Sequence, residues 1–110
     1  MIIKKWKILE YCSQSGGSYF RVWLESLSVE LRARVQARIF RIENGNLGDF
    51  KNIGHGIFEF RLAFGAGYRI YFGFDSGKII ILLCGGDKAK QHKDILRSRD
   101  LWLEYLRRAK

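Results

Sequence analysis

The residues best suited to chemistry in this chain are two arginines, Arg61 and Arg69, on either side of a Gly65-Ala66-Gly67 linker. Guanidinium groups stay charged at neutral pH and offer paired donors, so they suit the binding of a phosphate group. Held on one rigid surface, two of them would stabilise the negative charge that builds up on phosphate oxygens during a reaction. The pair therefore indicates a phosphodiester site.

If the phosphodiester belonged to RNA and were cleaved without a metal, the reaction would also need two proton transfers, one from the 2′-hydroxyl and one to the leaving oxygen. The candidates for these transfers are Lys51, Lys88 and Glu59, although Glu59 is better read as a salt-bridge partner of Arg61. The sequence holds no carboxylate cluster and no His pair at ligand spacing, so we expect neither a metal ion nor a cofactor. The predicted catalytic set is Arg69, Arg61, Lys51 and Lys88.

The arginines lie in a segment whose apolar and polar residues alternate. Residues 57–64 and 68–72 follow the period of two that is typical of strands with one buried face, so they predict a β-hairpin. A three-residue loop would set Arg61 directly across from Tyr71 and diagonal to Arg69. The polar face of the hairpin would then carry Glu59, Arg61, Arg69 and Tyr71.

The remaining elements follow from breakers, caps and apolar runs. An unbroken apolar run at residues 78–84 predicts an interior strand whose second face needs a cover, either the C-terminal helix or a bound partner. In that strand we expect Ile80, Leu82 and Cys84 to join the core, and Ile79, Ile81 and Leu83 to share the face of Arg69. The other predicted elements are strands at residues 2–12 and 50–53 and helices at residues 18–27, 28–43 and 89–108.

Arginines flank the apolar stripe of the helix predicted at residues 28–43. They follow helical spacing, so they form either a solvated flank or a basic ridge that meets RNA phosphates. The first turn of the last helix is also basic, which its helix dipole does not favour. The predicted RNA-contact set is Arg34, Arg38, Arg41, Lys90 and Tyr71.

Charge and composition narrow the class of protein. The chain has 20 Lys and Arg against 11 Asp and Glu, a formal net charge of +9, which favours a polyanion partner over a merely solubilising surface. Cys12 and Cys84 have no ligand-spaced companions and are expected to be reduced packing residues. The sequence shows neither a signal peptide nor a membrane-length apolar run, so we expect a cytoplasmic protein with no membrane partner.

Several blocks in the right order resemble the HigB-type addiction-module killer proteins of the RelE/ParE toxin superfamily, over most of the chain. The blocks are GNLGDFK at residues 45–51, GHGIFEFR at 54–61, GYRIYF at 67–72 and LLCGGDK at 82–88, with Gln91 and Asp94-Ile95.

The resemblance implies a single α+β toxin domain over residues 1–110. Two N-terminal helices would pack on a twisted, mostly antiparallel sheet of about four or five strands, with a helix at the C-terminus. A cognate antitoxin would neutralise the toxin, and operator DNA would be reached through the antitoxin complex. The implied activity is ribosome-dependent cleavage of mRNA. Arg69 matches the arginine directed at the scissile phosphate, and Lys51, Arg61 and Lys88 match basic positions around the cleft.

Two other functions stay open at this point. One is inhibition of DNA gyrase by binding, as in the ParE branch, through the C-terminal helix. The other is an idle domain that only binds antitoxin or operator DNA.

Overall fold

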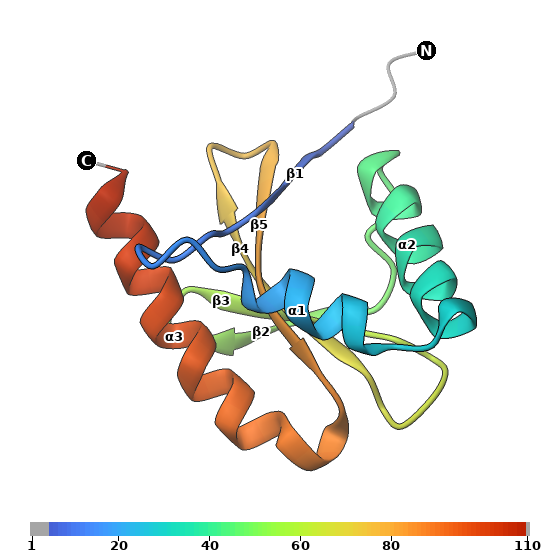
Figure 1. Cartoon of the computed structure of the whole chain (residues 1–110). Coiled ribbons are helices and arrows are strands. Elements are labelled where there is room, and N and C mark those ends of the chain that lie inside the picture. The colour runs from blue at the N-terminus through green and yellow to red at the C-terminus, as the bar shows by residue number, and fades with distance from the viewer. Residues whose placement is uncertain (1–4, 110) are drawn as a thin grey trace.

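Nine elements follow one another along the chain in a computed structural model, which describes residues 5–109 (Figure 1). They are β1 (Lys7–Glu10), α1 (Tyr19–Ser26), α2 (Val29–Glu43), β2 (Phe50–Gly54), β3 (Ile57–Arg61), β4 (Arg69–Asp75), β5 (Ile79–Gly86), a 3-10 turn η1 (Lys88–Lys90) and α3 (Gln91–Arg108).

Serine side chains start both N-terminal helices. The Ser18 hydroxyl accepts a hydrogen bond from the backbone N–H of Arg21 at 3.0 Å, and Ser28 accepts one from Leu31 at 3.2 Å. Each bond satisfies a donor that the first helical turn leaves free. The predicted starts of these two helices are therefore confirmed. The predicted strand at residues 2–12 is shorter, and residues 2–4 of that prediction lie outside the described residues.

The five strands form one sheet in the order β1-β5-β4-β3-β2. β1 runs parallel to β5, whereas the other three pairings are antiparallel. The apolar β5 therefore has a neighbour on each side, as predicted for an interior strand. No helix in the described part of the chain is long and apolar enough to cross a membrane.

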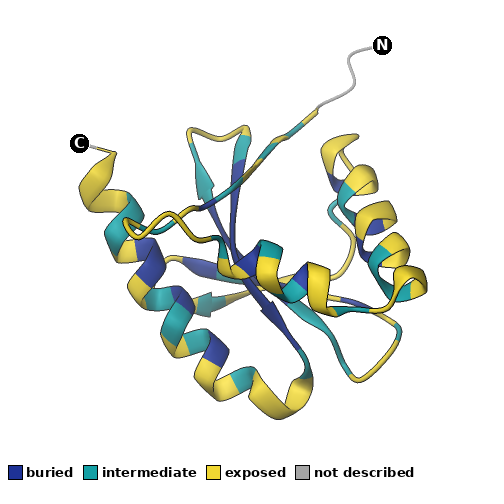
Figure 2. Cartoon of the chain, viewed as in Figure 1, coloured by how far each residue is buried: buried dark blue, intermediate teal, exposed yellow. Residues whose placement is uncertain are grey.

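Helices cover both faces of the sheet, and the burial in Figure 2 is deepest along the strands between them. The N-terminal helices contribute to one cluster, in which the rings of Phe60 and Phe72 stack with centroids 3.9 Å apart. α3 covers the other face, where Leu101 and Trp102 pack on Tyr71 and Ile81. The C-terminal helix is thus the cover that the second apolar face of β5 needs.

The architecture predicted from the family resemblance is wrong. The sheet is mixed, because the chain's first strand fills the open edge of β5 by running parallel to it. The N-terminal helices do not form a pair on an antiparallel sheet. α1 lies over β5. α2 lies away from β5 and contributes to the same core cluster as α1, and α3 lies on the opposite side of the molecule (Figure 1).

The hairpin of β3 and β4 differs from its predicted register by two residues. Arg61 pairs with Arg69, and Glu59 pairs with Tyr71, because the loop runs from Leu62 to Tyr68 instead of spanning three residues. A shift of two residues keeps every side chain on its predicted face. It brings the two arginines directly opposite each other.

A bulge in the pairing of β4 with β5 changes the predicted faces of β5. The register shifts between Tyr71 and Phe72, so one extra residue of β5 is accommodated there. Cys84 therefore packs in the same cluster as Ile81 and Leu83, beneath α3, and not with Leu82.

Candidate functional site

A buried carboxylate stands at the centre of the predicted site. Glu59 of β3 is fully buried, and the Nε of Arg61 donates a hydrogen bond to its Oε1 at 3.3 Å. The Nε of Arg69 lies 3.5 Å from Oε2, close enough for a charge contact. Gln91, the first residue of α3, donates to the same oxygen at 3.1 Å. One carboxylate therefore orients two guanidinium groups, as expected for a salt-bridge partner of Arg61.

The β3–β4 loop holds Arg69 and brings Lys88 beside it. Arg69 donates from Nη1 to the carbonyl of Gly67 at 2.6 Å, and the backbone N–H of Lys88 donates to the carbonyl of Ala66 at 3.1 Å. Gly67 has a positive φ of 70°, and a Cβ there would lie 3.1 Å from Lys88 Cβ and 3.3 Å from Arg69 Nη1. A glycine is needed for both reasons.

Lys51 completes the group, which we call the Glu59 site: Lys51, Glu59, Arg61, Arg69, Lys88 and Gln91. Lys51 pairs with Glu59 across β2 and β3, so both side chains lie on the same face. Two cations therefore contact the carboxylate of Glu59, while Lys51 pairs with Glu59 across the strands and Lys88 lies beside the loop that holds Arg69. In the described part of the chain, Lys51 and Lys88 form no ion pair and the Nη atoms of Arg61 make no hydrogen bond, so these groups are available to an anion.

Arg61 and Arg69 differ in exposure. The Arg61 side chain is 45% exposed and that of Arg69 only 12%, because the loop and the start of α3 enclose the latter. Arg69 is therefore the fixed member of the pair, and Arg61 is the member that an incoming phosphate would meet first.

Two residues of the predicted RNA-contact set are buried and do not face solvent. Arg38 donates to the carbonyls of Arg61, Leu47 and Asp49 at 2.9–3.1 Å, and burial lowers its pKa. Arg38 therefore stabilises the backbone at Arg61 from α2, on the face of the sheet opposite α3. Tyr71 lies beneath α3 with no exposed surface, and burial raises its pKa.

The other members of that set are exposed but scattered. Arg34 lies over the ring of Phe64, with its Cζ 4.3 Å from the centroid, and Arg41 is in the last turn of α2. Lys90 occupies the N-cap position of α3 without a side-chain capping bond, close in sequence to Lys88. Of these three exposed residues, Lys90 is the one beside the Glu59 site in sequence, because it lies between Lys88 and Gln91.

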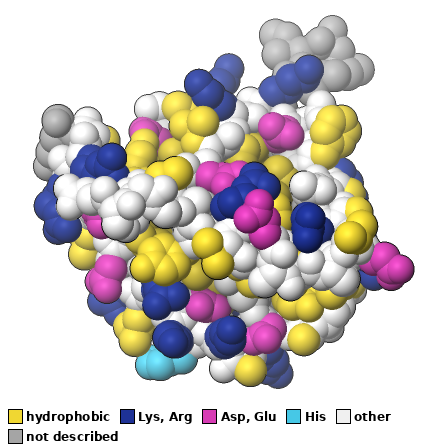
Figure 3. Space-filling view, viewed as in Figure 1, with side chains coloured by type: hydrophobic (Ala, Val, Ile, Leu, Met, Phe, Trp, Pro, Cys, Tyr) yellow, Lys and Arg dark blue, Asp and Glu magenta, His cyan; other side chains and the backbone are white. Residues whose placement is uncertain are grey.

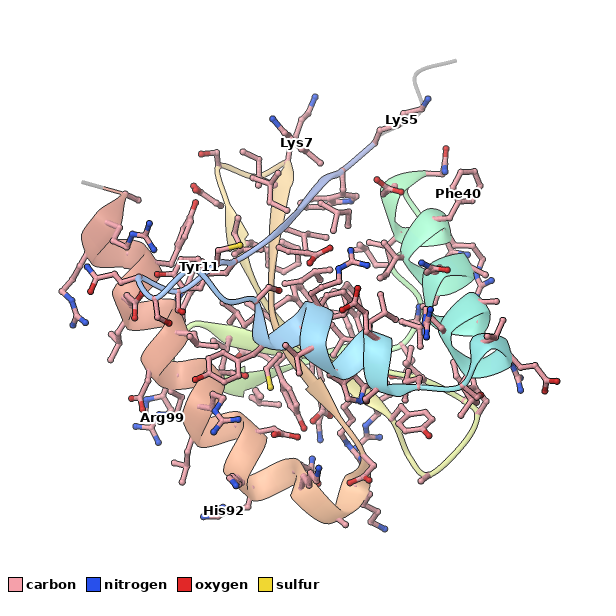
Figure 4. All side chains as sticks on the ribbon, in the orientation of Figure 1. Lys5, Lys7, Tyr11, Phe40, His92 and Arg99 are labelled. Atoms are coloured by element: carbon pink, nitrogen blue, oxygen red, sulfur yellow. The ribbon has the colours of Figure 1, made fainter. Side chains whose placement is uncertain are left out.

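The histidines lie away from the Glu59 site. His55 is exposed in the β2–β3 turn, and His92 points outward from the first turn of α3 (Figure 4). Cys12 is exposed and Cys84 buried, both as free thiols, so the prediction of a packing role holds only for Cys84. Residues 5–109 contain no group of three His, Cys, Asp or Glu placed to share a metal ion.

A group of buried polar atoms under α3 was missed by the sequence reasoning. The hydroxyl of Tyr71 has no hydrogen-bond partner in the described structure, and the side chains of Asp94 and Ser98 lie within hydrogen-bonding reach of the Cys84 thiol. Burial raises the pKa of Asp94, and it raises that of the nearby Cys84 to about 12. Asp94 and Ser98 are four residues apart on α3, a spacing that could have placed both on the sheet-facing side.

Comparison with known proteins places these features in a family. The model of the phage-derived protein Gp49-like family matches residues 22–97, a span that includes the whole Glu59 site. An uncharacterized protein of Haemophilus influenzae is 46% identical over 81 residues, which cover 73% of this chain and 82% of that protein. No solved structure matches the chain. The chain belongs to the Gp49-like family of phage-derived proteins.

Proposed function

We propose that this chain is the toxin of a type II toxin-antitoxin module and that it cleaves mRNA on the ribosome without a metal ion. Membership of the Gp49-like family supports the broader part, because the family is toxin-like and belongs to toxin-antitoxin systems. The cognate antitoxin would be its neutralising partner, and the ribosome would position the mRNA.

The observation that carries the nuclease part is the excess of positive charge at the Glu59 site. Glu59 offsets one of the four cations, and its two oxygens hold the arginines side by side. A phosphodiester that approaches Arg61 would meet preorganised donors whose orientation is already set before binding. Lys51 and Lys88, on the neighbouring strand and turn, would contact the phosphates on either side or take part in proton transfer.

The experiment maps cuts in mRNA bound to ribosomes after addition of the purified protein, by primer extension. The variant is Arg61→Ala, because this side chain is half exposed and its loss leaves Arg69 and Gln91 on Glu59. We expect cleavage to fall by about 10²-fold or more, the usual effect of removing one transition-state donor. The matched control is Arg107→Ala, which removes the same charge from an exposed position near the end of α3.

Two results would overturn the proposal. One is Arg61→Ala cutting as fast as the unchanged protein. The other is an absence of cuts together with inhibition of DNA supercoiling by gyrase, which would support the binding-toxin alternative. Thermal unfolding of each variant separates loss of activity from loss of the fold.

A further inference from the structure

Arg38 of α2 is a cation in the interior of a molecule whose other charges mostly lie outside. Figure 3 shows Lys and Arg side chains at the surface, several of them beside Asp or Glu. Arg38 is only 8% exposed, and no carboxylate within residues 5–109 forms an ion pair with it. A buried charge without an ion-pair partner is costly. Burial and repulsion from Arg41 accordingly lower the pKa of Arg38, against the attraction of Asp49.

The contacts of Arg38 join two segments of the chain. Its Nη1 donates to the carbonyl of Arg61 at 2.9 Å, and its Nη2 donates to the carbonyls of Leu47 and Asp49 at 3.0 and 3.1 Å. The backbone N–H of Arg61 in turn donates to the Asp49 carbonyl at 3.1 Å. One guanidinium therefore ties the end of β3 to the turn that leads into β2, and both backbone polar groups of Arg61 are held.

The guanidinium of Arg38 is enclosed on two sides. Gly48 has a positive φ of 65°, and a Cβ there would lie 2.8 Å from Nη2. The ring of Phe60 lies on the core side, with its centroid 5.5 Å from Cζ. The glycine admits the close approach of the turn, and the ring limits movement of the guanidinium in the other direction.

Both segments that Arg38 joins carry cations of the Glu59 site. Lys51 follows Asp49 by two residues and pairs with Glu59, whereas Arg61 is itself the residue whose carbonyl Arg38 contacts. The Arg61 side chain is 45% exposed, and its Nε contact with Glu59 is the one hydrogen bond recorded for it. Its orientation therefore depends on Glu59 at one end and on a fixed backbone at the other.

We propose that Arg38 is a positioning residue for RNA cleavage: by holding the Arg61 backbone against the turn before β2, it sets the spacing of Arg61 and Lys51 around the phosphodiester. The inference rests on the proposed function and makes α2 part of the apparatus without any contact with RNA. It replaces the sequence-based prediction that Arg38 contacts RNA phosphates itself. A misplacement of about 1 Å can cost as much as 10²-fold in rate, so such support is consequential.

The test measures the rate of mRNA cleavage on ribosomes as a function of protein concentration. Arg38→Lys keeps the charge, but a single ammonium on a shorter stem cannot reach all three carbonyls. We expect the maximal rate to fall by about tenfold or more, with the half-saturating concentration little changed, because the lost effect belongs to the transition state. The control is Arg32→Lys, on the same helix, where Nη2 donates to the Leu27 carbonyl in the α1–α2 connection.

A second pair of variants separates positioning from a general loss of structure. In an Arg61→Ala background, Arg38→Lys should cause little further loss, because the group that it positions is gone. Equal losses in the two backgrounds would overturn the inference. If Arg38→Lys does not fold, Gly48→Ala disturbs the same contact from the other side, since its Cβ would displace Nη2. A folded Arg38→Lys protein that cuts as fast as the unchanged protein would also overturn the inference.

Hydrogen exchange of the Arg61 amide, followed by NMR, gives a readout that needs no cleavage. This amide donates to Asp49, so it should exchange about tenfold faster in Arg38→Lys, while the amides of β5 keep their rates. An unchanged rate at Arg61 would overturn the positioning role. Absence of cuts by the unchanged protein would instead overturn the proposed function, and exchange would still decide whether Arg38 holds Arg61.

Discussion

The two faces of the sheet differ in the kind of side chain that they bury. The face beneath α1 and α2 carries a dense aromatic core, in which Phe60, Phe72 and Phe20 are almost completely buried. The face beneath α3 buries Glu59, Asp94 and polar atoms without hydrogen-bond partners. Buried unpaired polar groups lower stability, whereas close apolar packing raises it. The first face therefore supplies stability that offsets the polar groups of the second.

Adjacent residues of β4 allow the comparison to be tested on one strand, because Phe72 and Tyr71 face opposite ways. Phe72→Ala should lower the free energy of unfolding by about 3–5 kcal/mol, since it leaves a cavity beside Phe60. Urea denaturation followed by circular dichroism measures this loss. Val22→Ala, at a position 68% exposed, is the control. A loss for Phe72→Ala as small as that of the control would mean that this face is not the main source of stability.

Tyr71→Phe should instead raise the free energy of unfolding. The substitution removes a buried hydroxyl without a hydrogen-bond partner and keeps the ring, so we expect stability to rise by about 1 kcal/mol. The same denaturation measurement applies. Tyr105→Phe is a contrasting control, because the Tyr105 hydroxyl donates to Asp75 and its removal should cost stability. A stability loss for Tyr71→Phe would show that its hydroxyl is satisfied after all.

The smallest effect on stability is expected for Asp94→Asn, and this effect depends on pH. The pKa of Asp94 is raised by burial, against the opposing influence of Lys90 and Arg97, so the neutral acid persists to higher pH in the folded protein than in the unfolded chain. The stability that this shift contributes is present below the ordinary carboxyl pKa and is lost as pH rises through the raised value. Asn cannot titrate, so Asp94→Asn should gain melting temperature over the unchanged protein at about pH 7 and lose that gain near pH 3.5.

Calorimetry at the two pH values measures this difference. A gain that is equal at both would show that the carboxyl is not the titrating group.

Sequence periodicity was enough to place the Glu59 site on one face, but not to set its geometry. Alternation fixed the faces of Glu59, Arg61 and Arg69, and a loop longer than three residues preserved them because the register moved by two. The loop length itself depends on contacts with Lys88, far along the chain, and those contacts leave no local signal.

The failures of the sequence reasoning have one common cause. Arg38 lies at helical spacing with two exposed arginines, yet it reaches carbonyl groups of the Arg61 and Asp49 segments. Periodicity says which side of a helix a residue occupies but not what approaches that side. The parallel docking of β1 is likewise a long-range event, and no pattern within residues 2–12 distinguishes parallel from antiparallel pairing.

That docking has a consequence for biosynthesis. The residues of β1 are made about 70 residues before Ile79–Leu82, with which they pair at the edge of the sheet in the described part of the chain. The nascent chain must therefore carry this lysine-bearing segment unpaired until residues 79–82 have been made, and the entropy of closing so long a loop slows the pairing of β1 with β5.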